Sequence, residues 1–175
     1  MTSIAIGEQA PAFALPDTAG AVHEPGVSPA TVLIFTCNHC PYALAWHERT
    51  IAVARDYAGK GVRVLAVNPN DADRYPKDSL EAMRARVQAG EFDGVPYLRD
   101  ESQQVAKAYD AKTTPDVFVL DAENVLRYRG APDADYDDPS QNAAYLRAAL
   151  DAVLEGGEPD LAETEPVGCS IKWRA

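Results

Sequence analysis

Two cysteines separated by two residues are the part of this sequence with the clearest chemistry. Cys37 and Cys40 enclose Asn38 and His39 in the run TVLIFTCNHCPY. Two thiols at this spacing in a first helical turn can close a disulfide, and the N-terminus of a helix favours a thiolate. The alternatives are a zinc half-site or two unrelated cysteines, but the sequence holds no second CxxC and no HxxxH to complete a zinc site. The pair therefore predicts redox chemistry.

The neighbours of the pair leave open which sulfur the helix activates. If the helix begins at Cys37, the ring of Pro41 crowds the carbonyl four residues back, whereas Pro41 is well placed at the first helical position if Cys40 is the cap. A kinked first turn could satisfy both arrangements. His39 can hydrogen-bond to a thiolate or stabilise its charge, which makes the disulfide more oxidising. The alternative for His39 is an exposed polar side chain.

A third cysteine, Cys169, lies near the end of the sequence in VGCSIKW. It can resolve a mixed disulfide or a sulfenic acid at the main pair, or it can be a packed or exposed tail cysteine. Ile171 and Trp173 give this segment apolar anchors, so we expect it to dock on the body of the protein. An odd number of cysteines is a poor basis for structural disulfides. The zinc alternative would use Cys37, Cys40, Cys169 and His39 or His47.

Two other segments carry weaker signals. Thr114 and Pro115 directly precede the apolar run DVFVL, and a proline is tolerated at the first residue of a strand. The acidic segment APDADYDDPS, residues 131–140, has aspartates at alternating positions but lacks the glycine and the terminal glutamate of a calcium loop. We expect a solvated turn there.

Composition narrows the classes of protein and partner. A chain of 175 residues with 46% hydrophobic and 25% charged residues is expected to form one domain, residues 1–175, with residues 158–175 as a tail. The net charge of -11 and the lack of clustered lysine or arginine argue against nucleic acid and anionic membranes as partners. The N-terminal run has neither a basic region nor an apolar stretch of membrane length, so we expect a cytoplasmic protein.

The apolar patterns predict alternating strands and helices. A strand at 31–36, a helix within 43–61 and a strand at 62–68 form a unit long enough for a right-handed parallel crossover. A helix at 78–90 with Asp78 or Ser79 as its cap, a short strand at 95–98 and a helix at 101–111 follow. The runs 116–121 and 125–130 form a hairpin, and a last helix covers 143–157. We predict an α/β fold with a mixed sheet, helices on both faces, a β extension at the N-terminus and a C-terminal tail.

Taken together, the CxxC after a buried strand, the Thr114–Pro115 pair and the final hairpin and helix resemble the thioredoxin fold. The opening IGEQAPAFALPD is similar to the start of its redoxin (AhpC/TSA) branch. The segments FTCNHCPY, AVNPND, YPKDS, VPYLRDESQQVAKAYDA, TPDVFVLD, YRG and GCSIKW are similar to a group of thioredoxin-like, peroxiredoxin-like proteins found mainly in bacteria.

The resemblance implies roles for several residues. Cys37 would be the more exposed thiol and attack first, and Cys40 would resolve. Pro115 would be cis and packed against the pair, and its neighbouring backbone would offer strand-like hydrogen bonds to a bound peptide. Together with His39, whose position between the two cysteines suggests it, we predict that Thr114 and Pro115 modulate the pair, and we predict no cofactor and no metal.

The sequence also departs from the peroxiredoxin pattern P-x-x-x-T-x-x-C. Aligned on Cys40, which Pro41 follows, the Thr position holds Cys37 and the Pro position holds Leu33. Arg127 and Arg129 could supply a guanidinium from elsewhere.

We therefore predict a thiol:disulfide oxidoreductase that uses Cys37 and Cys40, with protein or small-molecule disulfides and thiols and an unidentified electron donor as partners. One alternative is a low-efficiency peroxidase that uses Cys40 or Cys37, with Cys169 as the resolving thiol. Another is a zinc-binding or adaptor protein on the same scaffold.

Overall fold

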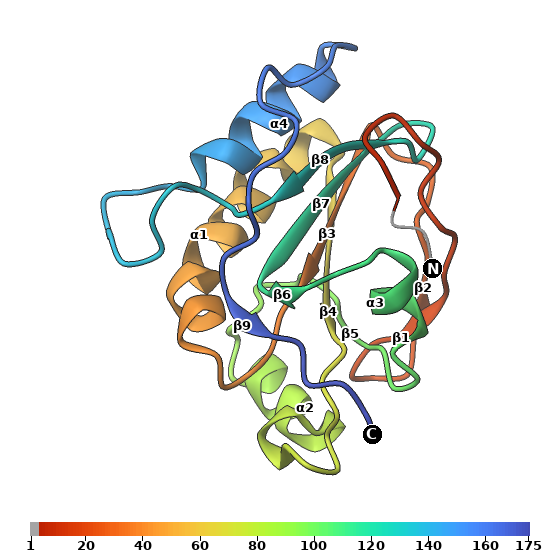
Figure 1. Cartoon of the computed structure of the whole chain (residues 1–175), viewed down its shortest axis with the longest axis vertical. Helices are drawn as coiled ribbons and strands as arrows, with labels where there is room; N and C mark the ends of the chain where they lie inside the picture. The colour runs from red at the N-terminus through yellow and green to blue at the C-terminus, as the bar shows by residue number, and fades with distance from the viewer. Residues whose placement is uncertain (1–3) are drawn as a thin grey trace.

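A five-stranded mixed sheet forms the centre of the computed structural model, which describes residues 4–175 (Figure 1). Its strands lie in the order β5-β4-β3-β7-β8, with β3 and β4 parallel, β4 and β5 parallel, and β7 antiparallel to both β3 and β8. Their bounds are Ala30–Phe35 (β3), Arg63–Asn68 (β4), Tyr97–Arg99 (β5), Asp116–Asp121 (β7) and Leu126–Gly130 (β8). This arrangement confirms the predicted mixed sheet and its final hairpin.

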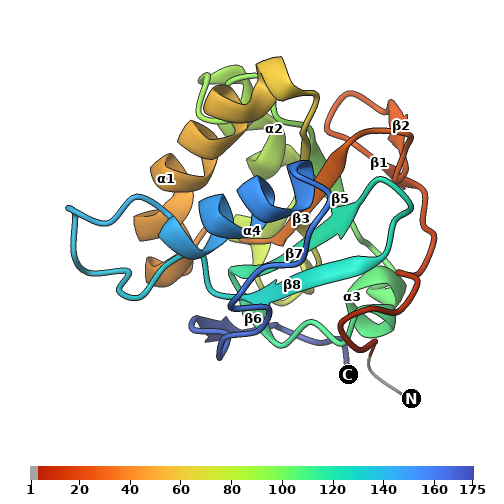
Figure 2. The ribbon, with the colours of Figure 1, turned by 90° about the horizontal axis from the view of Figure 1, so that it is seen from above.

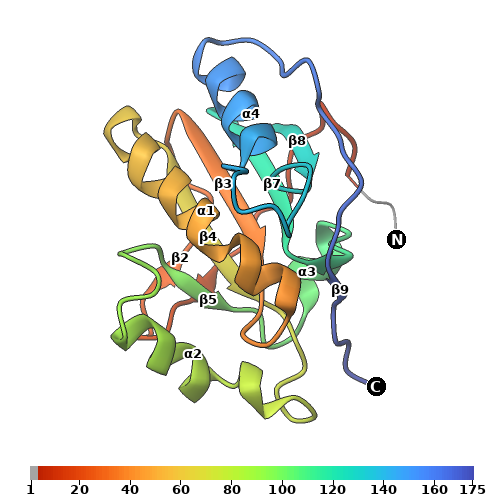
Figure 3. The ribbon, with the colours of Figure 1, turned by 90° about the vertical axis from the view of Figure 1, so that its left-hand side faces the viewer.

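Helices cover both faces of the sheet. Helices α1 (Pro41–Tyr57), α2 (Leu80–Gln88) and α4 (Ala144–Leu154) contribute to one apolar core, and α3 (Gln104–Ala108) contributes to the other (Figures 2 and 3). Short 3-10 turns occupy Ala58–Lys60 (η1) and Pro76–Asp78 (η2). Every residue of β3 is buried because both of its faces are covered, which explains its uninterrupted apolar run.

The alternation of side chains along β3 assigns its residues to the two cores. Val32 and Ile34 face α1, whereas Leu33 and Phe35 face α3 and the N-terminal segment. The loop that holds the two cysteines follows directly after Phe35. It is therefore fixed at the end of the most deeply buried strand.

Both ends of the described chain pack against this body. Strands β1 (Leu15–Pro16) and β2 (Val22–His23) form the short extension expected near the N-terminus. The sequence pattern assigned no element to residues 158–175, but the structure forms strand β9 (Cys169–Ser170), which pairs antiparallel with β6 (Thr113–Thr114) (Figure 1). The tail is thus part of the fold beside the cysteine loop.

The acidic segment 131–140 is more ordered than the solvated turn that we expected. Asp133 is buried, and its carboxylate accepts hydrogen bonds from Trp46 Nε1 at 2.8 Å and from Arg49 at 3.0 Å. The Arg49 guanidinium also donates to three carbonyl groups of the segment. The expected solvated turn therefore describes residues 134–140, which are exposed or half-buried, but not the start of the segment, where the buried ion pair of Asp133 with Arg49 ties it to α1.

Among residues 4–175, no helix has both the length and the apolar character needed to cross a bilayer.

Candidate active site

Helix α1 begins at Pro41, and Cys40 is its N-cap residue with extended backbone angles. Proline at the first helical position loses no hydrogen bond, because the N–H at that position has no partner within the helix. Of the two arrangements that the sequence left open, the structure adopts the one in which the helix terminus faces Cys40. Cys37 lies in the preceding loop, three residues before the N-cap.

The two thiols are buried side by side next to the Thr114–Pro115 pair. Cys37 and Cys40 are both free and expose 1% and 0% of their surface. Cys37 Sγ lies 3.3 Å from Thr114 Oγ1, and Cys40 Sγ lies 3.1 Å from the Thr114 carbonyl oxygen. The Thr114–Pro115 peptide bond is cis, as the resemblance implies. The two cysteines and the Thr114–Pro115 pair, which were predicted for the site, therefore lie together. Both thiols are buried in this structure.

The surroundings of the two sulfurs favour a thiolate on Cys40. A hydrogen bond from the Cys37 thiol lowers the pKa of Cys40, and the Cys169 thiol and the Ala43 backbone N–H lower it further, against the opposing effect of burial. The Cys40 thiol donates to the Thr114 carbonyl oxygen in this structure, and that acceptor favours the protonated form. The pKa of Cys37 is raised by its hydrogen bond to Cys40, by burial and by the negative charge of Asp78. This is the reverse of the order that the resemblance implies.

Asp78 is a central residue of the site that the sequence analysis considered only as a helix cap. Ser79 fills the cap position, since its Oγ accepts a hydrogen bond from Ala82 N. The buried Asp78 carboxylate instead accepts hydrogen bonds from the backbone N–H of Asn38 at 2.7 Å and from the side chain of Asn68 at 3.0 Å. Asp78 thereby holds the loop between the two cysteines against the end of β4.

Additional side chains hold the same loop in place. Asn70 Nδ2 donates to Asp78 Oδ2 at 3.0 Å, and Asn38 Oδ1 accepts from Tyr97 Oη at 2.7 Å and from Arg86 at 2.9 Å. The signal that could have revealed this network is the polar run AVNPND after a buried strand. The carboxyl ends of parallel strands collect at one edge of a sheet, so polar groups there lie close together.

His39 is held by Asp78 rather than by a thiol. Its Nδ1 lies 2.6 Å from Asp78 Oδ2, but off the line that a hydrogen bond requires, and its ring stacks on Tyr75 with centroids 5.8 Å apart. The backbone N–H of His39 is one of the groups that lower the pKa of Cys37. The contact between His39 and Cys37 is therefore made by the backbone N–H in this structure and not by the imidazole, from which we predicted it.

One group of side chains in the described part of the chain has donor atoms close enough to share a metal ion. A sulfur of Cys37, a ring nitrogen of His39 and a carboxylate oxygen of Asp78 lie within 4.8 Å of one another. This set differs from the zinc set considered from the sequence.

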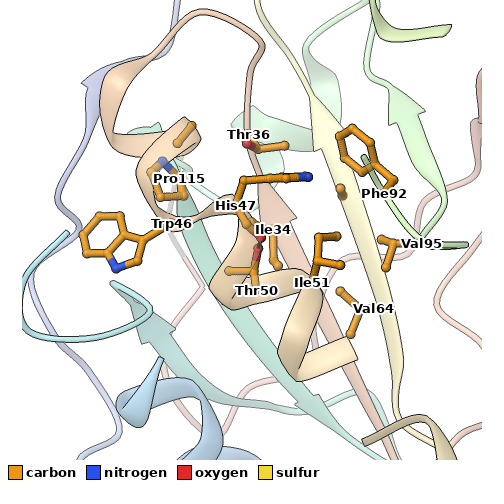
Figure 4. A pocket seen from close by; sticks show the side chains of 12 residues that line it. Ile34, Thr36, Trp46, His47, Thr50, Ile51, Val64, Phe92, Val95 and Pro115 are labelled. Atoms are coloured by element: carbon orange, nitrogen blue, oxygen red, sulfur yellow. Dashed lines mark hydrogen bonds between the residues drawn. The ribbon is translucent and has the colours of Figure 1, made fainter. Parts of the chain in front are cut away.

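His47, which belonged to that zinc set, is directed toward Phe92 in a small pocket beneath α1, and its Nε2 pairs with the Glu91 carbonyl at 2.6 Å (Figure 4).

The pocket in Figure 4 does not offer a substrate site. Its volume is about 10 Å³, which is room for about one water molecule. The arginines considered for a peroxide are also engaged elsewhere. Arg127 pairs with Asp121 and Glu158, and Arg129 donates to the carbonyls of Ile4 and Asp110.

Cys169 is the third thiol of the site. It is partly buried, packs against the cluster of Cys37, Cys40 and Ala43, and interacts with Cys40 through both its thiol and its backbone N–H. Burial and the neighbouring Cys40 raise its pKa to about 11. The tail docks on the body as we expected from its apolar residues, and its sulfur interacts with Cys40.

The sheet order, the cis-proline beside a CxxC and the helix that begins directly after the second cysteine define a redoxin of the thioredoxin superfamily. The comparisons with known proteins agree. The family model described as AhpC/TSA family matches residues 6–129, and the chain belongs to this family. Membership assigns a thioredoxin-like redox function in general terms. No curated protein matches the chain.

Solved structures match over nearly the whole chain. A hypothetical protein from Sinorhizobium meliloti 1021 is 42% identical with a TM-score of 0.92 and covers 99% of this chain and 97% of its own. An uncharacterized conserved protein from Geobacillus kaustophilus is 41% identical with a TM-score of 0.90, over 97% and 93% of the two chains. A secreted disulfide oxidoreductase from Mycobacterium tuberculosis shares the fold at 18% identity and a TM-score of 0.57, over 75% and 94%.

Proposed function

We propose that the protein is a thiol:disulfide oxidoreductase whose working groups are Cys37 and Cys40. The observation that carries the proposal is the contact between two buried thiols, one of which is the N-cap of a helix. The helix terminus and the neighbouring donors stabilise a thiolate, and the thiolate is the form of cysteine that attacks a disulfide. The adjacent cis-proline segment has backbone groups that can pair with an extended peptide.

In the proposed reaction, the Cys40 thiolate attacks one sulfur of a substrate disulfide. The substrate bond breaks, a mixed disulfide forms on Cys40, and the other substrate sulfur leaves as a thiolate and takes up a proton. Cys37 then loses its proton and attacks the Cys40 sulfur. This step forms the Cys37–Cys40 disulfide and releases the second substrate thiol, so the substrate is reduced by two electrons and the protein is oxidised by two. The reverse sequence oxidises a substrate dithiol.

Single-cysteine variants test both the function and the order of attack. In a Cys169→Ser background, which removes the third thiol beside Cys40, we expect Cys37→Ser to hold substrate as a mixed disulfide on Cys40, and Cys40→Ser to trap about tenfold less. Turnover of insulin disulfides with a chemical thiol as reductant should be lost in both variants. Mixed disulfides that accumulate on Cys37 in Cys40→Ser and are absent from Cys37→Ser would restore the order that the resemblance implies. Unchanged turnover in both variants would rule out the function.

A peroxidase is the second candidate, and one observation favours it. Cys40 caps the helix, precedes Pro41 and has a third thiol beside it. A Cys40 thiolate and a hydroperoxide would give a sulfenic acid and an alcohol, and a Cys169 thiol would then form a disulfide and release water. The test is consumption of hydroperoxide by the reduced protein, measured beside Cys40→Ser. Equal rates for the two proteins would remove this candidate.

A further inference from the structure

The C-terminal strand occupies the backbone edge that the proposed function assigns to a substrate. Strand β9 pairs antiparallel with β6 (Figure 1), so that Cys169 lies opposite Thr114 and Ser170 lies opposite Thr113. Strand β6 ends directly before Pro115. An extended peptide that adds to this edge would form its hydrogen bonds with the same residues. The tail and a substrate therefore compete for one edge.

Contacts on both sides of Cys169 hold this strand in place. Ahead of it, Thr164 N donates to the Arg129 carbonyl at 3.0 Å. After it, Lys172 N donates to Asn70 Oδ1 at 2.9 Å, and Ile171 is buried with 3% of its surface exposed. Arg174 forms ion pairs with Asp71, Asp73 and Glu101. The Cys169 sulfur is thus presented to Cys40 by an anchored segment.

The fit of the strand is tight at one residue beside Cys169. A Cβ atom on Gly168 would lie 2.3 Å from the Thr114 carbonyl oxygen, which is closer than real Cβ contacts. The tail can lie this close to Thr114 because residue 168 has no side chain. This close approach brings the next residue, Cys169, alongside the pair.

We propose that Cys169 is a third redox residue of the site, which takes over the bond to Cys40 from Cys37 and thereby fastens β9 across the substrate edge. The inference rests on the proposed function, since it starts from the Cys37–Cys40 disulfide. Cys169 loses its proton and attacks Cys40 Sγ. The Cys37–Cys40 bond breaks, the Cys40–Cys169 bond forms, and Cys37 leaves as a thiolate that takes up the proton. The protein remains oxidised by two electrons, and no further oxidant is consumed.

The surroundings of both sulfurs suit this exchange. One cause of the raised Cys169 pKa is the charge of the Cys40 thiolate, and this charge is absent once Cys40 is in a disulfide. Thr114 Oγ1 and the His39 backbone N–H stabilise the departing Cys37 thiolate, against burial and the charge of Asp78, which raise the pKa of Cys37. The exchange therefore links oxidation of the pair to a covalent bond that holds β9 on the edge it already covers, where substrate would bind.

Disulfide mapping of the full chain tests the inference. The reduced protein is oxidised with excess oxidised dithiothreitol, quenched in acid, blocked with N-ethylmaleimide, digested with trypsin and analysed by mass spectrometry. The first tryptic cut falls after Arg49, so Cys37 and Cys40 share one peptide and Cys169 lies on another. We expect a fraction of the protein to carry these two peptides joined through Cys40, with Cys37 blocked.

Two glycine variants serve as the test of this pairing and as its control. Gly168→Val should push β9 away from β6 and lower the Cys40–Cys169 fraction about tenfold, while the Cys37–Cys40 disulfide still forms, because the effective concentration of the tail thiol falls. Gly59→Ala is the control, since its added Cβ meets no atom within 4 Å. It should map as the wild type does.

The outcomes separate this inference from the proposed function. A Cys37–Cys40 disulfide without any Cys169 cross-link in the wild type would overturn the inference and leave the proposed function intact. If neither disulfide forms, both fail. A cross-link that is equally abundant in Gly168→Val and Gly59→Ala would show that the pairing of β9 with β6 does not direct the exchange, and would also overturn it.

Discussion

Replacement of Asp78 by asparagine should weaken the protein and shift the titration of Cys37. The carboxylate has no exposed surface and accepts hydrogen bonds from Asn38 N, Asn68 Nδ2 and Asn70 Nδ2. In Asp78→Asn, the amide oxygen can keep the two bonds made by Oδ1. The new NH₂ group then faces the Asn70 amide, so two donors meet in a buried site.

The size of the effect follows from these contacts. A buried donor left without an acceptor costs about 1 to 3 kcal/mol, and hydrogen bonds to a charged group are roughly twice as strong as neutral ones. We therefore expect Asp78→Asn to lower the free energy of unfolding by about 2 to 5 kcal/mol. The measurement is urea denaturation followed by far-ultraviolet circular dichroism. Asp93→Asn is the matched control, since Asp93 is an exposed partner of Arg55 and should change stability by less than about 0.5 kcal/mol.

A second readout separates the charge of Asp78 from its structural role. The negative charge of Asp78 raises the pKa of Cys37, so its removal should lower that pKa. In a Cys40→Ser background, alkylation of Cys37 should therefore reach its half-maximal rate at a lower pH in Asp78→Asn than in Asp93→Asn. Unchanged stability together with an unchanged titration of Cys37 would refute the assignment of Asp78 to the site.

Three further predictions concern single side chains. Burial raises the pKa of Asp116 from 3.8 to about 7, so its contribution to stability is full below pH 3.8 and is lost as the pH rises toward 7. Urea unfolding at a series of pH values should show a smaller loss of stability over this window in Asp116→Asn, and an unchanged slope would contradict the prediction. Asp133→Ala leaves the Arg49 charge unpaired and should lower the free energy of unfolding by about 3 to 5 kcal/mol in the same assay. A change below about 1 kcal/mol would contradict a structural role for this ion pair. Thr114→Val removes a hydrogen bond that lowers the pKa of Cys37, so alkylation of Cys37 should need a higher pH. An equal pH profile would show that the contact is not made.

The strands, the main helices and the CxxC site could be predicted from the sequence because their signals are local. The run at 31–36 holds four consecutive apolar residues, 32–35, as a strand covered on both faces requires, and the helix that follows has the 3.6-residue period. The pairing of β9 with β6 could not be predicted in this way. It joins two strands of two residues each, 113–114 and 169–170, which are too short to show a period.

The roles of Asp78 and Asp133 were missed for a related reason. Each aspartate lies in a polar, turn-rich segment, and such segments are usually exposed. Both carboxylates are buried because distant residues supply their partners, Asn38 for Asp78 and Arg49 for Asp133. A single sequence does not contain that pairing. Which of the two cysteines the helix terminus faces depended on Pro41. The sequence allows two positions for this proline at the start of the helix, and only the structure distinguishes them.

The most direct test of the proposed redox pair is a redox titration of the Cys169→Ser variant, in which the pair has no third thiol to exchange with, against a series of reduced and oxidised dithiothreitol buffers. Free thiols are blocked at each potential, and Cys37 and Cys40 are quantified by mass spectrometry. The proposal predicts that the two cysteines lose their free thiols together in a single two-electron transition, with slope n = 2. If Cys37 and Cys40 remain reduced throughout, or titrate independently of each other, the proposed function is contradicted.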